Sequence, residues 1–261
     1  MENQTIDSGI RVIFGKFGKG KGTLNTMFAC SEMQDVNRYE NCLNSIEMLS
    51  QATGKKYSLP LQNHCVYSSY DIMFNGEKAY DFEPDSFMLP NKEYEYSIFP
   101  PFSCFHIDEA QSGNLSAYDW AKFPKPALLA YARVRHPHYL FTLDLQFITN
   151  LNKTVKKFAF EYLTPLDIQN EYNCLNQLVK TSVVVGVFYS FDKALEYEDK
   201  LDTSLIKEYR VYTHNGDIYS CFDSYGKLLE FFDTDKDFSY TKVTISDLKN
   251  KNEKYKEFIL S

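Results

Sequence analysis

A glycine- and lysine-rich segment near the N-terminus has the composition and spacing of a phosphate-binding loop. It runs from Gly15 to Thr23 and fits the pattern G-x-x-x-x-G-K, with Gly15, Gly20 and Lys21 in the defining positions. Glycines let backbone N–H groups curl around phosphate oxygens, and a helix that begins there adds the positive end of its dipole. Lys21 supplies a full positive charge for the terminal phosphates, so the segment predicts a nucleotide site.

The loop departs from the usual pattern at Gly22, because a serine or threonine normally follows the lysine and holds Mg²⁺. The hydroxyl arrives one residue later, at Thr23. Either the loop is shifted by one residue, or magnesium is held through water and Asp108. A flexible basic linker is the alternative to a site, but a predicted strand and a predicted helix flank this segment. The residues predicted to bind the nucleotide are Gly15, Lys16, Phe17, Gly18, Lys19, Gly20, Lys21, Gly22 and Thr23, and the predicted metal ligands are Thr23 and Asp108.

Two acids follow an apolar run that reads as a strand. The run is residues 103–107, and Asp108 and Glu109 come directly after it. In enzymes with a phosphate loop the first such acid binds Mg²⁺, usually through water, and a second can polarise the attacking water. The alternative is a pair of acids that begins the next helix. His106 interrupts the apolar run and is interpreted as a core histidine with satisfied hydrogen bonds.

Further polar groups surround a third predicted strand, residues 139–145. Gln146 follows it and is a candidate contact for the γ-phosphate or its water, or else a loop glutamine. Arg135 precedes it within an Arg-Val-Arg-His segment; an arginine there can complete a neighbouring subunit's site or lie solvated at a helix end. Three lysines form a second basic cluster that could contact DNA phosphates, at Lys153, Lys156 and Lys157.

The order of the predicted elements favours an α/β fold with a mostly parallel central sheet flanked by helices. Strands are expected at 10–14, 64–68, 103–107, 139–145, 159–163 and 181–189, and helices at 23–33, 39–50, 115–122, 127–134 and 150–158. We divide the chain into a core, residues 1–170, and a small C-terminal α+β extension, residues 171–261. In the extension, His214 to Asp217 predicts a hairpin turn, and residues 247–261 a solvated helix or tail.

The composition narrows the class of protein. A net charge of −7 argues against a surface coated with basic groups for nucleic acid, although it leaves room for a local basic patch. The six cysteines are scattered and form no C-x-x-C pair, so we interpret them as reduced thiols of an intracellular protein. The sequence opens without a secretory signal, and its apolar runs are too short to span a membrane. A cytoplasmic location follows, with any membrane contact made through a partner.

Taken together, these blocks resemble the zonula occludens toxin-like ATPases, the filamentous phage assembly family. The resemblance covers about residues 10–165 and rests on the loop, Val66-Tyr67-Ser68, Ile107-Asp-Glu-Ala-Gln111, the segment at Arg135-His136 and the strand to Gln146, where Leu145 replaces a threonine. The tail from 181 to 232, which contains Ile218-Tyr-Ser-Cys-Phe-Asp-Ser224, resembles the segment that follows the ATPase core in Gram-positive members.

The resemblance implies a phosphate-loop ATPase fold, with ATP and Mg²⁺ as cofactors, and an ATP-driven motor for export or packaging of phage or plasmid DNA or for virion assembly. It also implies a ring of identical subunits that works with phage or membrane assembly proteins at the inner face of the host membrane. Glu109, Gln146 and Arg135 would then be the catalytic residues. Two other classes stay open: a scaffold that binds nucleotide without hydrolysing it, suggested by Gly22, and a phage structural or adaptor protein without enzymatic activity.

Overall fold

The protein was analysed as a computed structural model that describes residues 8–16, 18–57, 59–82, 99–111, 131–222, 243–250 and 255–260. Within these ranges the fold is built on a single nine-stranded sheet, with a separate two-stranded β3–β4 ribbon, Met73–Phe74 and Glu77–Lys78, beside it. The strand order in the large sheet is β11-β10-β9-β8-β1-β7-β6-β2-β5. Its strands are β1 Gly9–Phe14, β2 Val66–Ser68, β5 Tyr80–Asp81, β6 Cys104–Ile107, β7 Leu140–Leu145, β8 Ala159–Tyr172, β9 Leu178–Phe188, β10 Glu208–Asn215 and β11 Tyr255–Ile259.

Most neighbouring strands run parallel, which confirms the predicted fold class. β1 pairs in parallel with β7 on one side and β8 on the other, and β7, β6, β2 and β5 follow in parallel. Within the nine-stranded sheet only the pairs β8–β9 and β9–β10 are antiparallel among the described strands, and the separate β3–β4 ribbon is antiparallel as well. In consequence β1, β6 and β7 end at the same edge of the sheet, where residues that follow these strands meet.

Burial on both sides explains why β1 is uniformly apolar apart from one arginine. Ile10, Val12 and Phe14 pack into the core on one face, while Ile13 packs into the core on the other. A strand covered on both faces reads as a continuous apolar run because alternate side chains enter two different cores. Arg11 lies on the face of Ile13 and is only 6% exposed, so it needs charged partners inside the protein.

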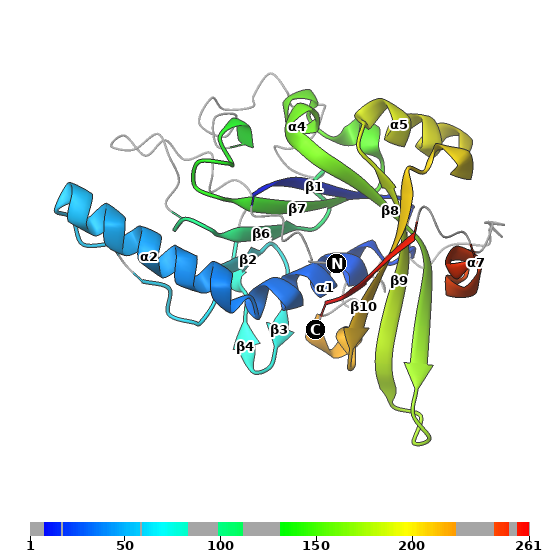
Figure 1. The fold of residues 1–261 in the computed structure, drawn as a ribbon, viewed down its shortest axis with the longest axis horizontal. Coiled ribbons are helices and arrows are strands. Elements are labelled where there is room, and N and C mark those ends of the chain that lie inside the picture. Colours follow the sequence, from blue (N-terminus) through cyan, green and yellow to red (C-terminus); the bar gives the residue numbers. More distant parts are fainter. Residues whose placement is uncertain are drawn as a thin grey trace.

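Helices cover both faces of the sheet (Figure 1). α1, Lys21–Met33, packs across β7, β6 and β10 on one face, and α4, Lys153–Phe158, and α5, Phe191–Lys200, lie on the other. α2, Val36–Thr53, begins where the Asp35 side chain caps the Arg38 amide, and it extends past the edge of the sheet. The remaining short helices are η3 Ile148–Asn150, η4 Thr203–Leu205, η5 Ile218–Cys221 and α7 Ile245–Lys249.

One buried arginine joins α2 to the sheet, beside a small apolar cluster in which Cys42 and Ile46 of α2 pack with Cys65. The guanidinium of Arg38 donates to the carbonyl oxygens of Phe102 at 2.7 Å and His138 at 2.8 Å, next to the first residues of β6 and β7. Both of these residues have positive φ, at 63° and 55°, and their rings stack with centroids 4.5 Å apart. Arg38 therefore joins α2 to the edge of the sheet opposite the carboxyl ends of β6 and β7.

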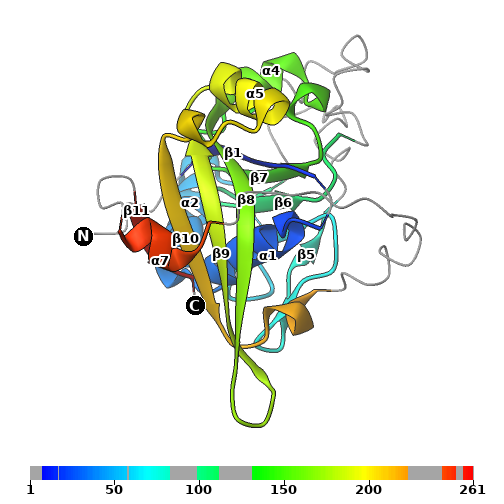
Figure 2. The same cartoon turned by 90° about the vertical axis from the view of Figure 1, so that its right-hand side faces the viewer.

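The C-terminal third is built into the sheet through β9, β10 and β11, and it differs from the prediction at three places (Figure 2). β8 continues through Pro165 to Tyr172, because a bulge between Pro165 and Asp167 accommodates the proline. The predicted hairpin at His214 is wrong: β10 ends at Asn215 and the chain enters η5.

The end of the chain also differs from the predicted tail, since β11 joins β10 in parallel as an edge strand. The division at residue 170 falls inside β8, and both main core clusters contain residues from either side of it, for example Val12 with Ala194 and Leu24 with Val183. The predicted helix at 115–122 and the first four residues of the one predicted at 127–134 lie outside the described residues.

The cysteines agree with the prediction of reduced thiols. All six are free, and five of them are buried; Cys174 in the β8–β9 turn is the exception and is exposed. None of the helices in the described part of the chain has the length and apolar character needed to span a bilayer.

Candidate active site

The glycine-rich loop joins the carboxyl end of β1 to the first turn of α1. Gly20 precedes the helix with φ +85°, and a Cβ on it would lie 2.4 Å from the Cδ1 atom of Ile168. A glycine is required there because other residues rarely adopt this backbone conformation and because β8 packs closely against it. Lys21 is 9% exposed and its Nζ donates to the carbonyl oxygen of Lys16 at 3.3 Å, so its side chain folds back over the loop.

The N-terminus of α1 is suited to an anion. Gly20 at the cap position has no side chain that could bind the first amides, and the first turn contains no acidic residue. The N–H groups of the first turn have no partners within the helix and carry the positive end of its dipole. Lys16 and Lys19 lie on the same loop. Burial lowers the pKa of Lys19; the charge of Asp167 raises this pKa, and the charge of Lys16 lowers it further. A bound anion would relieve this local excess of positive charge.

The acidic pair lies directly after β6, as predicted. The amide of Asp108 donates to the hydroxyl of Ser69 at 2.9 Å, and Ser69 follows β2, the neighbouring strand. Glu109 takes a positive φ of 49°, and the next amide, Ala110 N–H, donates to the carbonyl oxygen of Asp144 at 2.8 Å. The turn that carries both acids is therefore fixed to the ends of the strands on either side of it.

Asp144 is a member of this site that sequence reasoning missed. It lies on β7, opposite Ile13 of β1, and is only 2% exposed. Burial raises its pKa, and the adjacent charge of Asp108 and a hydrogen bond between the two carboxyl groups raise it further, while Lys21 acts in the opposite direction. The signal was present in the sequence: an acid inside an apolar strand must find a partner, because an isolated buried charge is costly.

β7 thus lies between the strand that carries the loop and the strand that carries the acids, and Lys21, Asp108 and Asp144 interact at the shared carboxyl edge. This chain has the fold of a P-loop nucleoside triphosphatase. The predicted loop follows β1 and the acidic pair follows β6, so both lie at the same edge of the sheet. Phe17 lies outside the described residues, and the roles assigned to the individual residues stay predictions.

The solved structures similar to this chain include several nucleotide-dependent enzymes. The N-terminal domain of zonular occludens toxin from Neisseria meningitidis aligns over 83% of this chain and 99% of its own, with 14% identity and a TM-score of 0.42. The genome packaging NTPase B204 of Sulfolobus turreted icosahedral virus 2 aligns over 82% and 94%, with 14% identity and a TM-score of 0.36. The Legionella pneumophila ATPase DotB aligns over 76% of this chain and 51% of its own, with 13% identity and a TM-score of 0.30.

No protein-family model and no curated protein matches the sequence. The first of the similar structures belongs to the family that the sequence resembles. At such identities and TM-scores, the likeness transfers no activity, substrate or partner to this chain.

Gln146 lies beside the loop, in a hollow of about 160 Å³. Lys16 and Lys19 line the same hollow from the loop, and α5 contributes Glu198, which accepts a hydrogen bond from the amide of Ile148 at 2.9 Å. Gln111 lies in the segment after the acidic pair, and its Oε1 atom accepts a hydrogen bond from the backbone N–H of Gln146 at 3.3 Å. The structure therefore brings Gln146 near the loop and the acids, as its predicted role requires.

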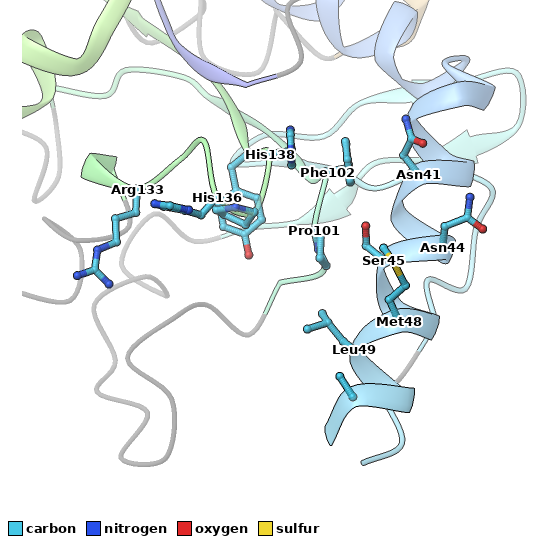
Figure 3. Close-up of a pocket in the computed structure, with 13 residues that line it drawn as sticks. Asn41, Asn44, Ser45, Met48, Leu49, Pro101, Phe102, Arg133, His136 and His138 are labelled. Carbon is cyan, nitrogen blue, oxygen red and sulfur yellow. The ribbon is translucent and has the colours of Figure 1, made fainter. Parts of the chain in front are cut away.

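Arg135 does not lie near the loop. It is exposed in the turn before β7, at the edge of the sheet opposite the carboxyl ends. Beside it, a second hollow of about 920 Å³ separates this turn from α2, lined among others by Arg133, His136, Met48 and Leu49 (Figure 3). Arg135 therefore cannot act on the phosphates of its own subunit, and its predicted role requires a neighbouring one.

The lysine cluster on α4 is less uniform than the sequence indicates. Lys153 and Lys157 are exposed, whereas the ammonium of Lys156 donates to the carbonyl oxygen of Thr149 at 2.9 Å and lies 4.5 Å from the centroid of the Phe191 ring. Burial lowers the pKa of Lys156, against the charge of Glu198. Lys156 thus contributes to packing α4 against α5, and two lysines of the cluster are presented to solvent.

A network of buried charges connects the strands on which the site is built. His106, on β6, uses both ring nitrogens: one contacts Asn25 Oδ1 at 2.7 Å and the other Glu32 Oε2 at 2.8 Å, both on α1. Glu32 also lies 3.7 Å from the guanidinium of Arg11 on β1, which donates to Glu161 on β8 at 2.9 Å. His106 is thus a core histidine with satisfied hydrogen bonds, as predicted.

The same network reaches the C-terminal strands. The second oxygen of Glu161 accepts from Arg210 on β10 at 2.6 Å, and Arg210 also donates to Tyr189 at 2.7 Å. Burial opposes the charge of Glu32, but the charges of His106 and Arg11 outweigh it and lower the pKa of Glu32 from 4.5 to about 2. Removing one partner of such a network leaves another charge buried and unpaired, which is costly.

Proposed function

We propose that this protein hydrolyses ATP with Mg²⁺ at the loop between β1 and α1. One observation carries the proposal: the charges of Lys21 and Asp108 both act on Asp144 at the carboxyl edge of parallel strands. A phosphate loop, its lysine and an adjacent carboxylate are the groups that hold a triphosphate and its metal ion in this class of enzyme.

The residues divide the chemistry among them. The loop amides and Lys21 bind the phosphates, Asp108 holds the metal ion directly or through water, and Glu109 orients the attacking water. Gln146 contacts the γ-phosphate or that water from the end of β7. The donor set fits Mg²⁺, which prefers carboxylate and phosphate oxygens, and the ion would neutralise the charge on the phosphate oxygens.

We infer further that hydrolysis drives a ring of identical subunits that moves phage or plasmid DNA during export, packaging or virion assembly. The resemblance of the sequence to the filamentous phage assembly ATPases supports this finer proposal. Exposed basic residues, among them Arg135, Lys153 and Lys157, would contact DNA phosphates or a neighbouring site. Contact with the inner face of the host membrane would come through a partner.

The test is phosphate release with and without Mg²⁺, in the presence of no DNA, single-stranded DNA or double-stranded DNA. The proposal predicts turnover that requires Mg²⁺ and rises with one form of DNA. Metal-dependent turnover that no DNA alters would support the ATPase and refute the DNA motor. Absence of turnover with intact nucleotide binding would favour the alternative that Gly22 suggests, a scaffold that binds ATP without hydrolysing it.

A mixing experiment tests the ring and the role of Arg135 together. Arg135→Ala and Lys21→Ala should each be inactive alone. When the two are mixed, some interfaces combine an intact Lys21 with a neighbour's intact Arg135, so activity should partly return. Mixtures as inactive as the single variants would contradict a role for Arg135 in a neighbouring subunit's site.

A further inference from the structure

Packing does not explain why the loop lacks a hydroxyl at residue 22. Gly22 lies in the first turn of α1, and among the described residues a Cβ built on it would meet only the ring of Phe222, at 3.8 Å, an ordinary contact distance. Serine would therefore fit. Thr23 does not occupy the same place, because successive residues of an α-helix are rotated by about 100°, and it is buried to 6% exposure.

A second carboxylate lies beside the acid that is predicted to bind the metal ion. Asp144 is buried on β7, and its carbonyl oxygen accepts a hydrogen bond from the Ala110 amide at 2.8 Å, which fixes the turn that carries Asp108 to this end of β7. The charges of Asp108 and Lys21 both act on the Asp144 carboxyl group. On β7, Asp144 pairs with Ile13 of β1, and the preceding Leu143 pairs with Ile107 of β6. Asp144 therefore lies between the loop after β1 and the acidic pair after β6. When Lys21 is engaged with phosphates, the buried carboxylate of Asp144 and the partly buried carboxylate of Asp108 need a further positive charge.

We propose that Asp144 supplies the metal ligand that the loop lacks at Gly22, so that Asp108 and Asp144 hold the divalent cation together. The proposal rests on the proposed function, because it assumes a nucleotide on the loop. It has a chemical basis in the ion itself: Mg²⁺ is held by one or two carboxylates together with phosphate oxygens and water. A carboxylate from β7 would replace a hydroxyl from α1, with one more negative charge beside the ion.

The experiment measures binding, so it needs no turnover. Mn²⁺ replaces Mg²⁺ as the probe, and its affinity for the protein with a non-hydrolysable ATP analogue is followed by electron paramagnetic resonance. The variants are Asp144→Asn, Gly22→Ser and both together. Asp167→Asn is the matched control, since Asp167 interacts with Lys19 on the same loop but is not among the groups that act on Asp144. Thermal unfolding checks that each variant is folded.

Asp144→Asn should weaken Mn²⁺ binding by about tenfold or more, the size seen when a metal site loses a supporting group. Analogue binding without metal should stay close to wild type. Gly22→Ser should restore most of the Mn²⁺ affinity in the Asp144→Asn background, because it returns the missing hydroxyl. Asp167→Asn should leave Mn²⁺ affinity within about twofold of wild type, within the scatter of a surface substitution.

Two results would overturn the proposal: wild-type Mn²⁺ affinity in Asp144→Asn, or an equal loss in Asp167→Asn, which would reduce the effect to general charge. Failure to gain affinity on adding Gly22→Ser would refute the exchange of ligands. If the wild-type protein binds the analogue and Mn²⁺ as described but releases no phosphate, the ATPase proposal fails while this inference stands. If it binds neither, both fail.

Discussion

Replacing Glu32 with glutamine should change how the stability of the protein depends on pH. The pKa of Glu32 is lowered from 4.5 to about 2 by His106 and Arg11, in spite of burial. That difference corresponds to about 3 kcal/mol in favour of the folded state. The contribution is fully present above pH 4.5 and is lost as the pH falls toward 2, because the unfolded chain takes up the proton first. About 2 kcal/mol of it should already be lost at pH 3.

The assay is urea unfolding of wild-type protein and Glu32→Gln between pH 3 and 7. At pH 7 the variant should be less stable by about 3–5 kcal/mol, because Arg11 and His106 lose their shared partner. The difference between the two proteins should then shrink by about 2 kcal/mol on going to pH 3. A difference that stays constant across this range would refute the view that Glu32 is the ionised centre of the network.

A partly exposed glutamate on the surface of α5 provides the control for that experiment. The pKa of Glu196 is also lowered to about 2, by its hydrogen bonds to Lys193 and Lys200 on the surface of α5. Solvent screens such a pair, so its effect on stability is small. Glu196→Gln should follow the wild-type curve at all pH values, and any remaining difference should vanish in high salt.

Three further predictions follow from local packing. Gly20→Ala should weaken nucleotide binding about 30-fold or more in a fluorescence titration, because the new side chain strains a left-handed backbone and displaces Ile168. Gly18→Ala should weaken binding at most about tenfold, because its Cβ would meet no described atom within 4 Å. Arg38→Ala should lower the urea-derived stability by about 2–4 kcal/mol, because two carbonyl acceptors lose a charged donor; an unchanged midpoint would contradict its role in fastening α2. A thiol reagent should label one cysteine per native chain, Cys174, and more than one rapid label would contradict the burial of the others.

The sequence was sufficient for the parts of the site that local chemistry specifies. The glycines and lysines from Gly15 to Thr23 predicted a phosphate loop between a strand and a helix, and the acids at 108 and 109 mark the end of an apolar strand. The fold class followed from the alternation of strands and helices. Asp144 was missed because one acid within an apolar strand does not say which neighbouring strand its side chain will meet.

The errors concern pairings between distant parts of the chain. The Asn215-Gly216 pair predicts a hairpin, but the Gly216 amide instead donates to the carbonyl oxygen of Val179 at 2.7 Å and η5 follows. The last 15 residues were interpreted as a solvated helix or tail because they are rich in Lys, Asn and Glu. β11 lies among them, and its partner β10 lies far away in the sequence. Such pairings depend on which edge of the sheet remains open, and no local pattern encodes that.

The distance of Arg135 from the loop could not be predicted from the sequence, because it depends on the direction of β7 in the sheet. Its sequence neighbourhood, basic and close to a predicted strand, does not say at which end of the sheet it lies. Because β7 runs parallel to β1, the residues before β7 fall at the edge opposite the loop. Gln146, after the same strand, falls beside the loop for the same reason.

The most direct test of the site is Mg²⁺-dependent ATP hydrolysis by Lys21→Ala compared with Lys193→Ala, which removes an exposed lysine that pairs with Glu196 on the surface of α5. Removing one group that stabilises the transition state lowers turnover by about 100-fold or more. Lys21→Ala should therefore lose at least this much activity while melting at the wild-type temperature, and Lys193→Ala should keep full activity. Undiminished hydrolysis by Lys21→Ala would show that the chemistry takes place elsewhere.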